Sequence, residues 1–368
     1  MTDTAFEIFA TAPPGLEPLL LQQVQAAGFD GAQAVPGGVI FPGSWPDVWR
    51  ANLELRGAGR VLARFGSFLA FHLAQLDKRS RKFPWTETLR ADVPVRVEVT
   101  CHKSKIYHAG AAQQRIETAL REEAGITIAA DAPVTLKVRI DDNTVTLSVD
   151  TSGESLHKRG HKEAVGKAPM RETLASLFLA HCDYDGTEPV VDPMCGSGTF
   201  VIEAAEIARG LQPGRSRDFA FMQLASFDPA AFDRLRRTTP QDTALRFYGS
   251  DRDTGAVRNA TANAERAGVG DIVTFAHHAI SDLPRPAGPP GLVMVNPPYG
   301  ARIGNRNLLF PLYGALGATL KDRFRGWRVG LVTSEPGLAK ATGLPFTPDR
   351  LQVPHGGLRV TLFKTDAL

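Results

Sequence analysis

Two short stretches of the chain hold residues whose types and spacing suit chemistry on a polar ligand. The first, Val190–Ala205, reads VVDPMCGSGTFVIEAA: an apolar strand, an acid, a glycine turn and the start of a helix. Such a turn presents backbone N–H groups and the carboxylate of Asp192 to a small ligand. Val201 stands where a dinucleotide-binding turn has its third glycine, and the acid at the strand end would repel a pyrophosphate. Both features argue against a dinucleotide as the ligand. The pattern therefore favours a ligand with a cationic amino group.

A second acid follows the next predicted strand, in the stretch Gly249–Asp253. Asp251 at the end of that strand is placed to accept hydrogen bonds from both hydroxyls of a ribose. The structural alternative is that Asp251 or Asp253 caps the following helix. A ligand with an amino-acid end and a ribose matches S-adenosylmethionine, which we expect as the cofactor.

The second stretch is Asn296–Gly300, NPPYG, directly after the apolar residues Leu292–Val295. An amino nitrogen conjugated to a purine ring is a poor nucleophile, because its lone pair is delocalised. The Asn296 oxygen and a proline-backed carbonyl can accept both N–H bonds and aim the lone pair at a methyl group. Tyr299 can stack on an extruded base. We predict Asn296, Pro297, Pro298 and Tyr299 as catalytic residues; a proline-rich turn that merely ends a strand is the alternative.

Strand and helix patterns alternate from Glu188 onward, which indicates an α/β, doubly wound and mainly parallel sheet. The predicted strands are residues 190–191, 247–250, 272–275, 292–295 and 328–332, with helices around 202–209, 254–267 and 309–324. The last segments, 350–353 and 358–364, read as a hairpin around Pro354–Gly357. We therefore expect an antiparallel strand to close the sheet.

The N-terminal part reads as two small α+β units. The first has strands at 6–11 and 39–41 and helices from Leu16 to near Gly28 and at 45–55. The second has alternating strands at 95–99, 135–140 and 144–149 and a helix at about 111–123. Asp141-Asp142-Asn143 forms the predicted hairpin turn between the last two strands.

Basic residues gather at three places before the catalytic motifs. Lys78–Lys82 has four cations in five residues and precedes Phe83 and Trp85, Lys103 and Lys105 follow a strand, and residues 151–169 are polar and basic. Contact with nucleic-acid phosphates would explain this charge density. A solvated loop for the first run and a linker for the last are the alternatives.

Composition narrows the class of protein. The chain has 368 residues, 43% of them hydrophobic, and a net charge of +3, which suits two or three globular domains and permits a polyanionic partner. It has no apolar run long enough for a membrane span and no signal-peptide pattern, so we expect a cytoplasmic protein. Its three cysteines are widely spaced and His277-His278 has no third ligand at useful spacing, so we expect no disulfides and no metal.

With these motifs, the chain resembles the THUMP-domain class I RNA methyltransferases, with its nearest likeness to the guanine-N2 branch. The resemblance rests on Asp192–Ala205, Gly249–Asp253, Asn296–Gly300 and on the preceding segments His157–Gly160 and Ala168–Leu174. It implies a ferredoxin-like domain at 1–65, a THUMP RNA-binding domain at 66–152 and a Rossmann-like methyltransferase domain at 153–368. Within the last domain, 153–169 would be a basic linker and cofactor segment.

The resemblance also implies site residues. The cofactor-binding residues would be Pro169, Asp192, Met194, Cys195, Gly196, Gly198, Thr199, Phe200, Asp251, Arg252, Ala279, Ile280 and Asn296. The RNA-binding residues would be Arg79, Arg81, Lys82, Lys103, Lys105, Lys158 and Arg159. Two positions depart from the family: Ala279 replaces an acid near the cofactor adenine, where backbone groups or Asp282 would serve, and His355 replaces an asparagine of the final hairpin.

Several hypotheses stay open about the reaction. The predicted reaction is methyl transfer from S-adenosylmethionine to guanine N2 in RNA, with large-subunit rRNA favoured over tRNA by the overall arrangement and a monomer favoured as the working form. Adenine-N6 methylation is the alternative, because NPPY presents any exocyclic purine amine equally well. A non-catalytic RNA-binding assembly factor is the third hypothesis, against which the intact Asp192 and Asn296 count.

Overall fold

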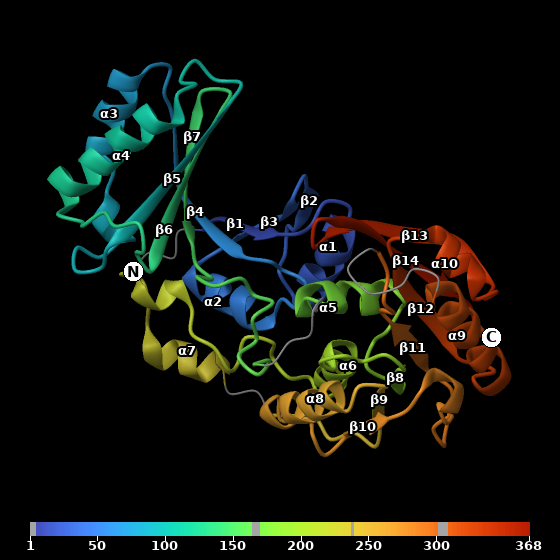
Figure 1. The fold of residues 1–368 in the computed structure, drawn as a ribbon. Helices are drawn as coiled ribbons and strands as arrows, with labels where there is room; N and C mark the ends of the chain where they lie inside the picture. Colours follow the sequence, from blue (N-terminus) through green and yellow to red (C-terminus); the bar gives the residue numbers. More distant parts are fainter. Residues whose placement is uncertain (1–4, 164–169, 237–238, 301–307) are drawn as a thin grey trace. The chain divides into compact units, whose positions relative to one another are not determined.

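The computed structural model describes residues 5–163, 170–236, 239–300 and 308–368. The chain divides into two compact units: residues 1–12, 21–156 and 217–237 form the first, and residues 13–20, 157–216 and 238–368 form the second. Each unit contains one seven-stranded sheet (Figure 1). The predicted cofactor residue Pro169 lies outside the described residues.

The first unit is built on a single sheet of order β2-β3-β1-β4-β7-β6-β5. Its strands are β1 (Phe6–Thr11), β2 (Gln33–Val35), β3 (Gly38–Gly43), β4 (Val61–Leu69), β5 (Val95–His102), β6 (Val134–Asp141) and β7 (Thr144–Asp150). Strand β4 pairs with β1 on one side and β7 on the other, so the two small α+β units expected from the sequence share one sheet. The expected boundary after residue 65 falls within β4, and the domain boundaries stay a prediction.

Helices α1 (Glu17–Ala26), α2 (Trp45–Glu54) and α4 (Ala109–Ala124) lie where the periodicity predicts them. The β6–β7 hairpin is confirmed, with Asp142 and Asn143 at φ 45° and 63°, the left-handed conformation of a tight hairpin turn. The basic run is not a loop. It forms the end of helix α3 (Leu73–Arg81), where cations complement the negative end of the helix dipole.

Helix α7 (Pro229–Arg236) was not predicted, and its segment, 217–237, clusters with the first unit in spite of its place in the chain. Its Phe232 lies in an aromatic cluster with Trp49, Phe221 and Phe227, whose ring centroids are 5.2 to 6.5 Å from that of Phe232. Burial of these rings against α2 accounts for the position of the segment.

The second unit has the sheet order β10-β9-β8-β11-β12-β14-β13. The strands are β8 (Val190–Asp192), β9 (Phe247–Asp251), β10 (Val273–His277), β11 (Leu292–Val295), β12 (Arg328–Thr333), β13 (Phe346–His355) and β14 (Leu358–Thr365). The first five in this order are parallel, whereas β14 pairs antiparallel with both β12 and β13. This arrangement confirms the predicted doubly wound sheet and its closing antiparallel hairpin.

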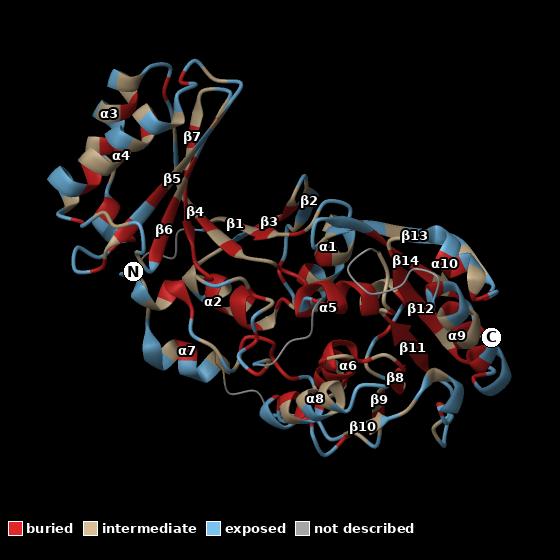
Figure 2. Ribbon diagram, viewed as in Figure 1, coloured by how far each residue is buried: buried red, intermediate tan, exposed pale blue. Residues whose placement is uncertain are grey.

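The second unit also contains the helices α5 (Glu172–His181), α6 (Thr199–Ala208), α8 (Thr254–Arg266), α9 (Leu309–Arg323) and α10 (Pro336–Ala341). Strand β11 is buried along its whole length, as are Val329 and Leu331 of β12 (Figure 2). Tyr313, Phe324 and Trp327 pack against these strands in one core cluster. The apolar strands are therefore held rigidly, and the residues at their carboxyl ends are held with them.

Candidate functional site

The carboxyl ends of three neighbouring strands carry the predicted polar residues. Asp192 ends β8, Asp251 ends β9, and Asn296 follows β11 directly. Strand β8 lies between β9 and β11. The strand order therefore runs outward from β8 in both directions, to β9 and β10 on one side and to β11 and β12 on the other. A reversal of strand order of this kind opens a crevice at the carboxyl edge, where doubly wound proteins bind ligands. The structure therefore brings the two sequence motifs together at one edge.

The glycine turn between β8 and α6 requires its glycines. Gly196 and Gly198 have φ values of 52° and 83°, which ordinary residues rarely adopt. A Cβ on Gly198 would lie 2.7 Å from the Phe275 ring and 3.1 Å from the Ala260 methyl, whereas one on Gly196 would meet nothing within 4 Å. The Cys195 N–H donates to the Ser250 carbonyl at 2.9 Å, which ties the turn to β9.

The two acids of the site differ in their partners. Asp251 accepts hydrogen bonds from the N–H groups of Gly196 and Asp253, both at 3.0 Å. Asp253 is the N-cap of α8 and accepts from Gly255 at 2.7 Å, so the capping role belongs to Asp253 rather than Asp251. Asp251 instead ties the glycine turn to the end of β9, at the carboxyl edge of the sheet.

Asp192 is 2% exposed, and its Oδ1 accepts one hydrogen bond, from the Met194 N–H at 3.0 Å. The pKa of this carboxyl is raised to about 8: burial is the main cause, the hydrogen bond from Met194 partly offsets it, and the nearby charge of Asp251 adds to the rise. No ion pair of Asp192 occurs within the described ranges. A buried acid of this kind becomes a favourable partner for a ligand that brings its own positive charge.

The Asn296–Tyr299 turn presents an unsatisfied acceptor. The Oδ1 atom of Asn296 is buried and has no hydrogen-bond partner among the residues that the structure describes. Such an atom costs about 1–3 kcal/mol unless a ligand donates to it. Pro297 is buried, and Tyr299 packs against the core cluster of β11 and α9. The turn can accept hydrogen bonds from an amino group, and it holds no general base.

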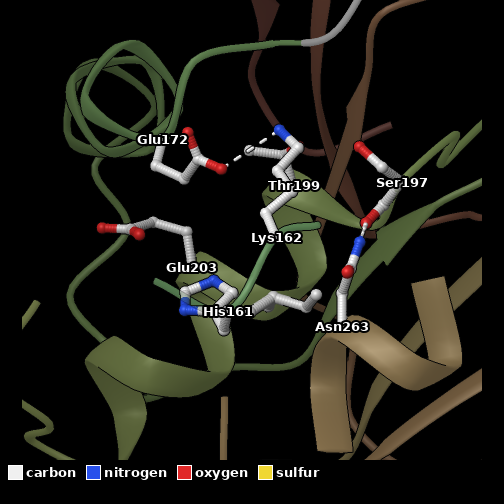
Figure 3. Close-up of a pocket in the computed structure, with 8 residues that line it drawn as sticks. His161, Lys162, Glu172, Ser197, Thr199, Glu203 and Asn263 are labelled. Atoms are coloured by element: carbon white, nitrogen blue, oxygen red, sulfur yellow. Dashed lines mark hydrogen bonds and ion pairs between the residues drawn. The ribbon is translucent and has the colours of Figure 1, made fainter. Parts of the chain in front are cut away.

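Behind the glycine turn lies a small pocket in which Lys162 and Glu172 form an ion pair (Figure 3). The Lys162 ammonium donates to the Met170 carbonyl at 2.8 Å and to Thr199 Oγ1 at 2.9 Å, and it lies 3.1 Å from the Glu172 carboxylate. Thr199 is the first residue of α6. These contacts attach the basic segment before α5 to the start of α6, a role that sequence reasoning missed.

The segment expected as a linker is therefore partly buried where it is described. Arg159 is 2% exposed and lies 3.5 Å from the equally buried Glu203, and the His161 carbonyl accepts from Arg266 at 2.8 Å. A buried, ion-paired guanidinium does not present its charge to a phosphate. The high charge density at 157–162 is the sequence feature that could have indicated this role. It belongs to a network of buried ion pairs rather than to a solvated linker.

The other predicted RNA-binding residues lie on the surface, where one of them, Arg81, is surrounded by carboxylates. Arg81 contacts three carboxylates, those of Asp77 at 3.1 Å, Glu122 at 2.6 Å and Glu123 at 2.8 Å, so its charge is neutralised. The remaining cations are exposed: Arg79, Lys82, Lys103, Lys105 and Lys158.

Of the remaining predicted cofactor residues, Met194, Cys195 and Gly196 belong to the turn itself. Phe200 is 1% exposed, so its side chain belongs to the core and only its backbone can face a ligand. Arg252 is exposed next to Asp251. The His278 N–H donates to the Asp251 carbonyl at 3.2 Å, which places the start of the Ala279–Ile280 segment beside the end of β9.

Other kinds of site find no support within the described ranges. They hold no group of three or more His, Cys, Asp or Glu side chains that could bind a metal ion. The same ranges hold no helix that is both long and apolar enough to span a membrane.

Comparison with known proteins decides the family. Residues 159–353 match the family described as RMKL-like, methyltransferase domain, and residues 7–62 match the RlmL ferredoxin-like domain. A protein of Synechocystis that is named an RNA methyltransferase is 32% identical over 97% of this chain and 95% of its own length. The chain belongs to this methyltransferase family. Its methyl donor is S-adenosylmethionine, and the two strand-end acids and the glycine turn fit that cofactor.

Further relatives match most or all of the chain. The ribosomal RNA large subunit methyltransferase K/L of Syntrophotalea carbinolica is 34% identical over 93% of this chain, which spans about half, 51%, of that protein. SMU.472, described as a methyltransferase and solved with SAH, has 27% identity and a TM-score of 0.87 and covers 100% of this chain and 99% of its own. A Listeria monocytogenes protein described as an N6-adenine-specific DNA methylase has 29% identity, a TM-score of 0.87 and coverages of 99% and 97%.

The crowding at the glycine turn leads to a stability prediction. We expect Gly198→Ala to lower the free energy of unfolding by roughly 2–5 kcal/mol, from left-handed backbone strain plus the clash with Phe275. Gly196→Ala is the matched control and should lose only about 1–2 kcal/mol, because it has the strain without the clash. Urea unfolding of both variants measures the difference; equal losses would refute the crowding argument.

Proposed function

We propose that this protein transfers a methyl group from S-adenosylmethionine to the exocyclic N2 of a guanosine in RNA. Large-subunit rRNA is the RNA that we favour as its substrate. The observation that carries the proposal is the buried Oδ1 of Asn296, which has no partner among the described residues and lies at the edge where the two strand-end acids also lie. An acceptor without a donor there suits an amino group brought by the substrate.

The two acids would hold the methyl donor by its two ends. Asp192 would bind the cationic amino group, because that charge compensates a buried carboxylate that has no cation beside it among the described residues. Asp251 would accept from the ribose hydroxyls, since its position at the end of β9 suits that role. The cofactor supplies an electrophilic methyl group on a sulfonium, and the chain supplies its orientation.

Asn296 would act on the acceptor nitrogen by hydrogen bonding alone. Its Oδ1 and the Pro297 carbonyl would accept the two N–H bonds, which favours a pyramidal nitrogen whose lone pair faces the methyl group. A neutral carboxamide takes no proton at pH 7, so the proton would leave the nitrogen after the methyl group has been transferred. Tyr299 would stack on the extruded base.

RNA is the substrate class that the relatives' names and the first unit favour. The Synechocystis and Syntrophotalea relatives are named for RNA and ribosomal RNA methylation. The first unit, which we assign to ferredoxin-like and THUMP domains at 1–65 and 66–152, exposes Lys103, Lys105 and two aromatic side chains. Tyr107 is 85% exposed and Phe71 41%, and the Lys105 ammonium lies 5.4 Å from the Phe71 ring centroid. Cations with exposed rings suit single-stranded RNA. We further propose a cytoplasmic monomer.

Adenine-N6 methylation is the second candidate, because the Listeria relative is described as an adenine methylase and the acceptors of the turn fit either amine. Incubation with labelled S-adenosylmethionine and RNA from a deletion strain, followed by nucleoside mass spectrometry, distinguishes them. Labelled N2-methylguanosine supports the proposal, and labelled N6-methyladenosine replaces it. Detection of neither, with RNA binding retained and no cofactor binding by calorimetry, would leave an RNA-binding assembly factor.

The role of Asn296 predicts a selective loss of turnover. We expect Asn296→Ala to lower kcat by about 100- to 1,000-fold, as for loss of one preorganised hydrogen-bonding group at a reacting centre. The Kd for S-adenosylmethionine should change less than about twofold. Asn259→Ala, on helix α8, serves as the control and should keep wild-type kcat. Near-wild-type turnover of Asn296→Ala would contradict the proposed role.

The raised pKa of Asp192 predicts pH-dependent cofactor binding. Below about pH 8 the free protein holds this carboxyl protonated, whereas the cationic amino group requires the carboxylate. The Kd for S-adenosylmethionine should therefore fall as the pH rises from 6 to 8, by up to about tenfold per unit. Calorimetry across this range measures it. Asp192→Asn should bind more weakly at pH 8 with a flatter pH profile, and a flat wild-type profile would count against the assignment.

The ion pairs of Arg81 predict that this residue contributes less to RNA binding than the exposed Lys105. Lys105→Gln should reduce the slope of log Kd against log salt concentration by about 0.7–0.9, the value for one lost phosphate contact. Arg81→Gln should leave the slope nearly unchanged, because three carboxylates already neutralise that cation. Fluorescence anisotropy with rRNA fragments at several salt concentrations tests the pair; equal slopes for the two variants would contradict this interpretation.

A further inference from the structure

A buried tyrosine hydroxyl contacts the backbone of the Asn296–Tyr299 turn from behind. Tyr313 of helix α9 is 0% exposed and packs in the core cluster beside β11 and β12. Its Oη lies 3.2 Å from the Pro298 carbonyl oxygen and 3.3 Å from Thr333 Oγ1. Thr333 ends β12 and is also 0% exposed. The catalytic turn is thus connected to two rigid elements through one hydroxyl.

The direction of these hydrogen bonds follows from the inventory of donors. Thr333 Oγ1 accepts from the Glu335 N–H at 3.2 Å, so its single proton is free to point at Tyr313. Tyr313 then accepts from Thr333 and donates its own proton to the Pro298 carbonyl. Burial raises the pKa of the Tyr313 hydroxyl, which keeps it protonated as a donor. In such a chain each bond polarises the next.

The turn needs an anchor of this kind because of its composition. Pro297 and Pro298 have no N–H, so the turn cannot be fixed by backbone donors at those two positions. Its carbonyls are the groups through which neighbouring elements can hold it. The Asn296 Oδ1, which has no partner among the described residues, is positioned by the backbone that carries it rather than by a contact of its own.

We propose that Tyr313, supported by Thr333, is the positioning residue of the catalytic turn. By holding the Pro298 carbonyl, it keeps the Pro297 carbonyl and the Asn296 Oδ1 at the separation that two hydrogens of one amino group require. The inference rests on the proposed methyl transfer to an amino nitrogen, and it holds for guanine and adenine alike. Tyr313 touches neither cofactor nor substrate.

The effect of the two hydroxyls therefore falls on kcat. Tyr313→Phe removes only the hydroxyl and should lower kcat by about 10- to 100-fold, the scale of a small misplacement of a reacting group. The KM for RNA and the Kd for S-adenosylmethionine should change less than about twofold. Thr333→Val should lower kcat by a smaller factor. Thr333→Ser, which keeps the hydroxyl, should have a kcat close to that of the wild type. The double variant Tyr313→Phe/Thr333→Val should be no slower than Tyr313→Phe, because both act through one chain.

Hydrogen exchange at the Tyr299 amide separates this inference from the proposed reaction. That amide follows the Pro298 carbonyl, and its exchange should be faster in Tyr313→Phe than in the wild type whether or not any RNA is methylated. A wild type that methylates no nucleoside would overturn the proposed function and leave this readout valid. Unchanged exchange, wild-type kcat in Tyr313→Phe, or equal loss in Thr333→Ser and Thr333→Val would overturn the positioning role.

Discussion

The reversal of strand order around β8 is the constraint on which the site depends. Because β9 and β11 flank β8 and all three are parallel, their carboxyl ends meet at one edge of the sheet. Asp192, Asp251 and Asn296 are distant in sequence and become neighbours through this topology alone. The complete burial of β11 then fixes the positions of these ends, since a strand packed on both faces cannot shift without opening the core.

Charge is distributed unequally on the two sides of the glycine turn. Behind it, Lys162 and Arg159 are matched by Glu172 and Glu203, so the buried network is close to neutral. At the edge, Asp192 is buried next to another acid and receives one backbone hydrogen bond. The cations of the segment before α5 are thus used to attach that segment to α6 and do not compensate Asp192. The imbalance leaves the edge selective for a ligand with a positive charge.

Local patterns in the sequence predicted the parts of the structure that local physics decides. Apolar strands at 190–191 and 292–295, the glycine turn and the β6–β7 hairpin were all predicted, because strand period, glycine conformation and turn residues are readable within a few positions. The basic segments were harder. A charged segment without apolar periodicity looks solvated, yet Arg159 is buried beside Glu203. The sequence does not reveal this contact, because the two residues are 44 positions apart in the chain. The Tyr313–Pro298 contact was equally invisible, since it joins a helix to a turn.

The two prolines of the Asn296–Tyr299 turn account both for the chemistry proposed for the turn and for the way the turn is held. A site that must accept two hydrogens from one amino group gains from acceptors whose lone pairs are not already used by neighbouring N–H groups. Prolines at two consecutive positions remove those local donors while fixing φ, so the carbonyls stay available. The same loss of donors deprives the turn of its usual hydrogen bonds, and a donor must come from elsewhere. Tyr313 supplies it at Pro298, one residue beyond the carbonyl that faces the substrate in the proposed reaction, so support and catalysis use different carbonyls.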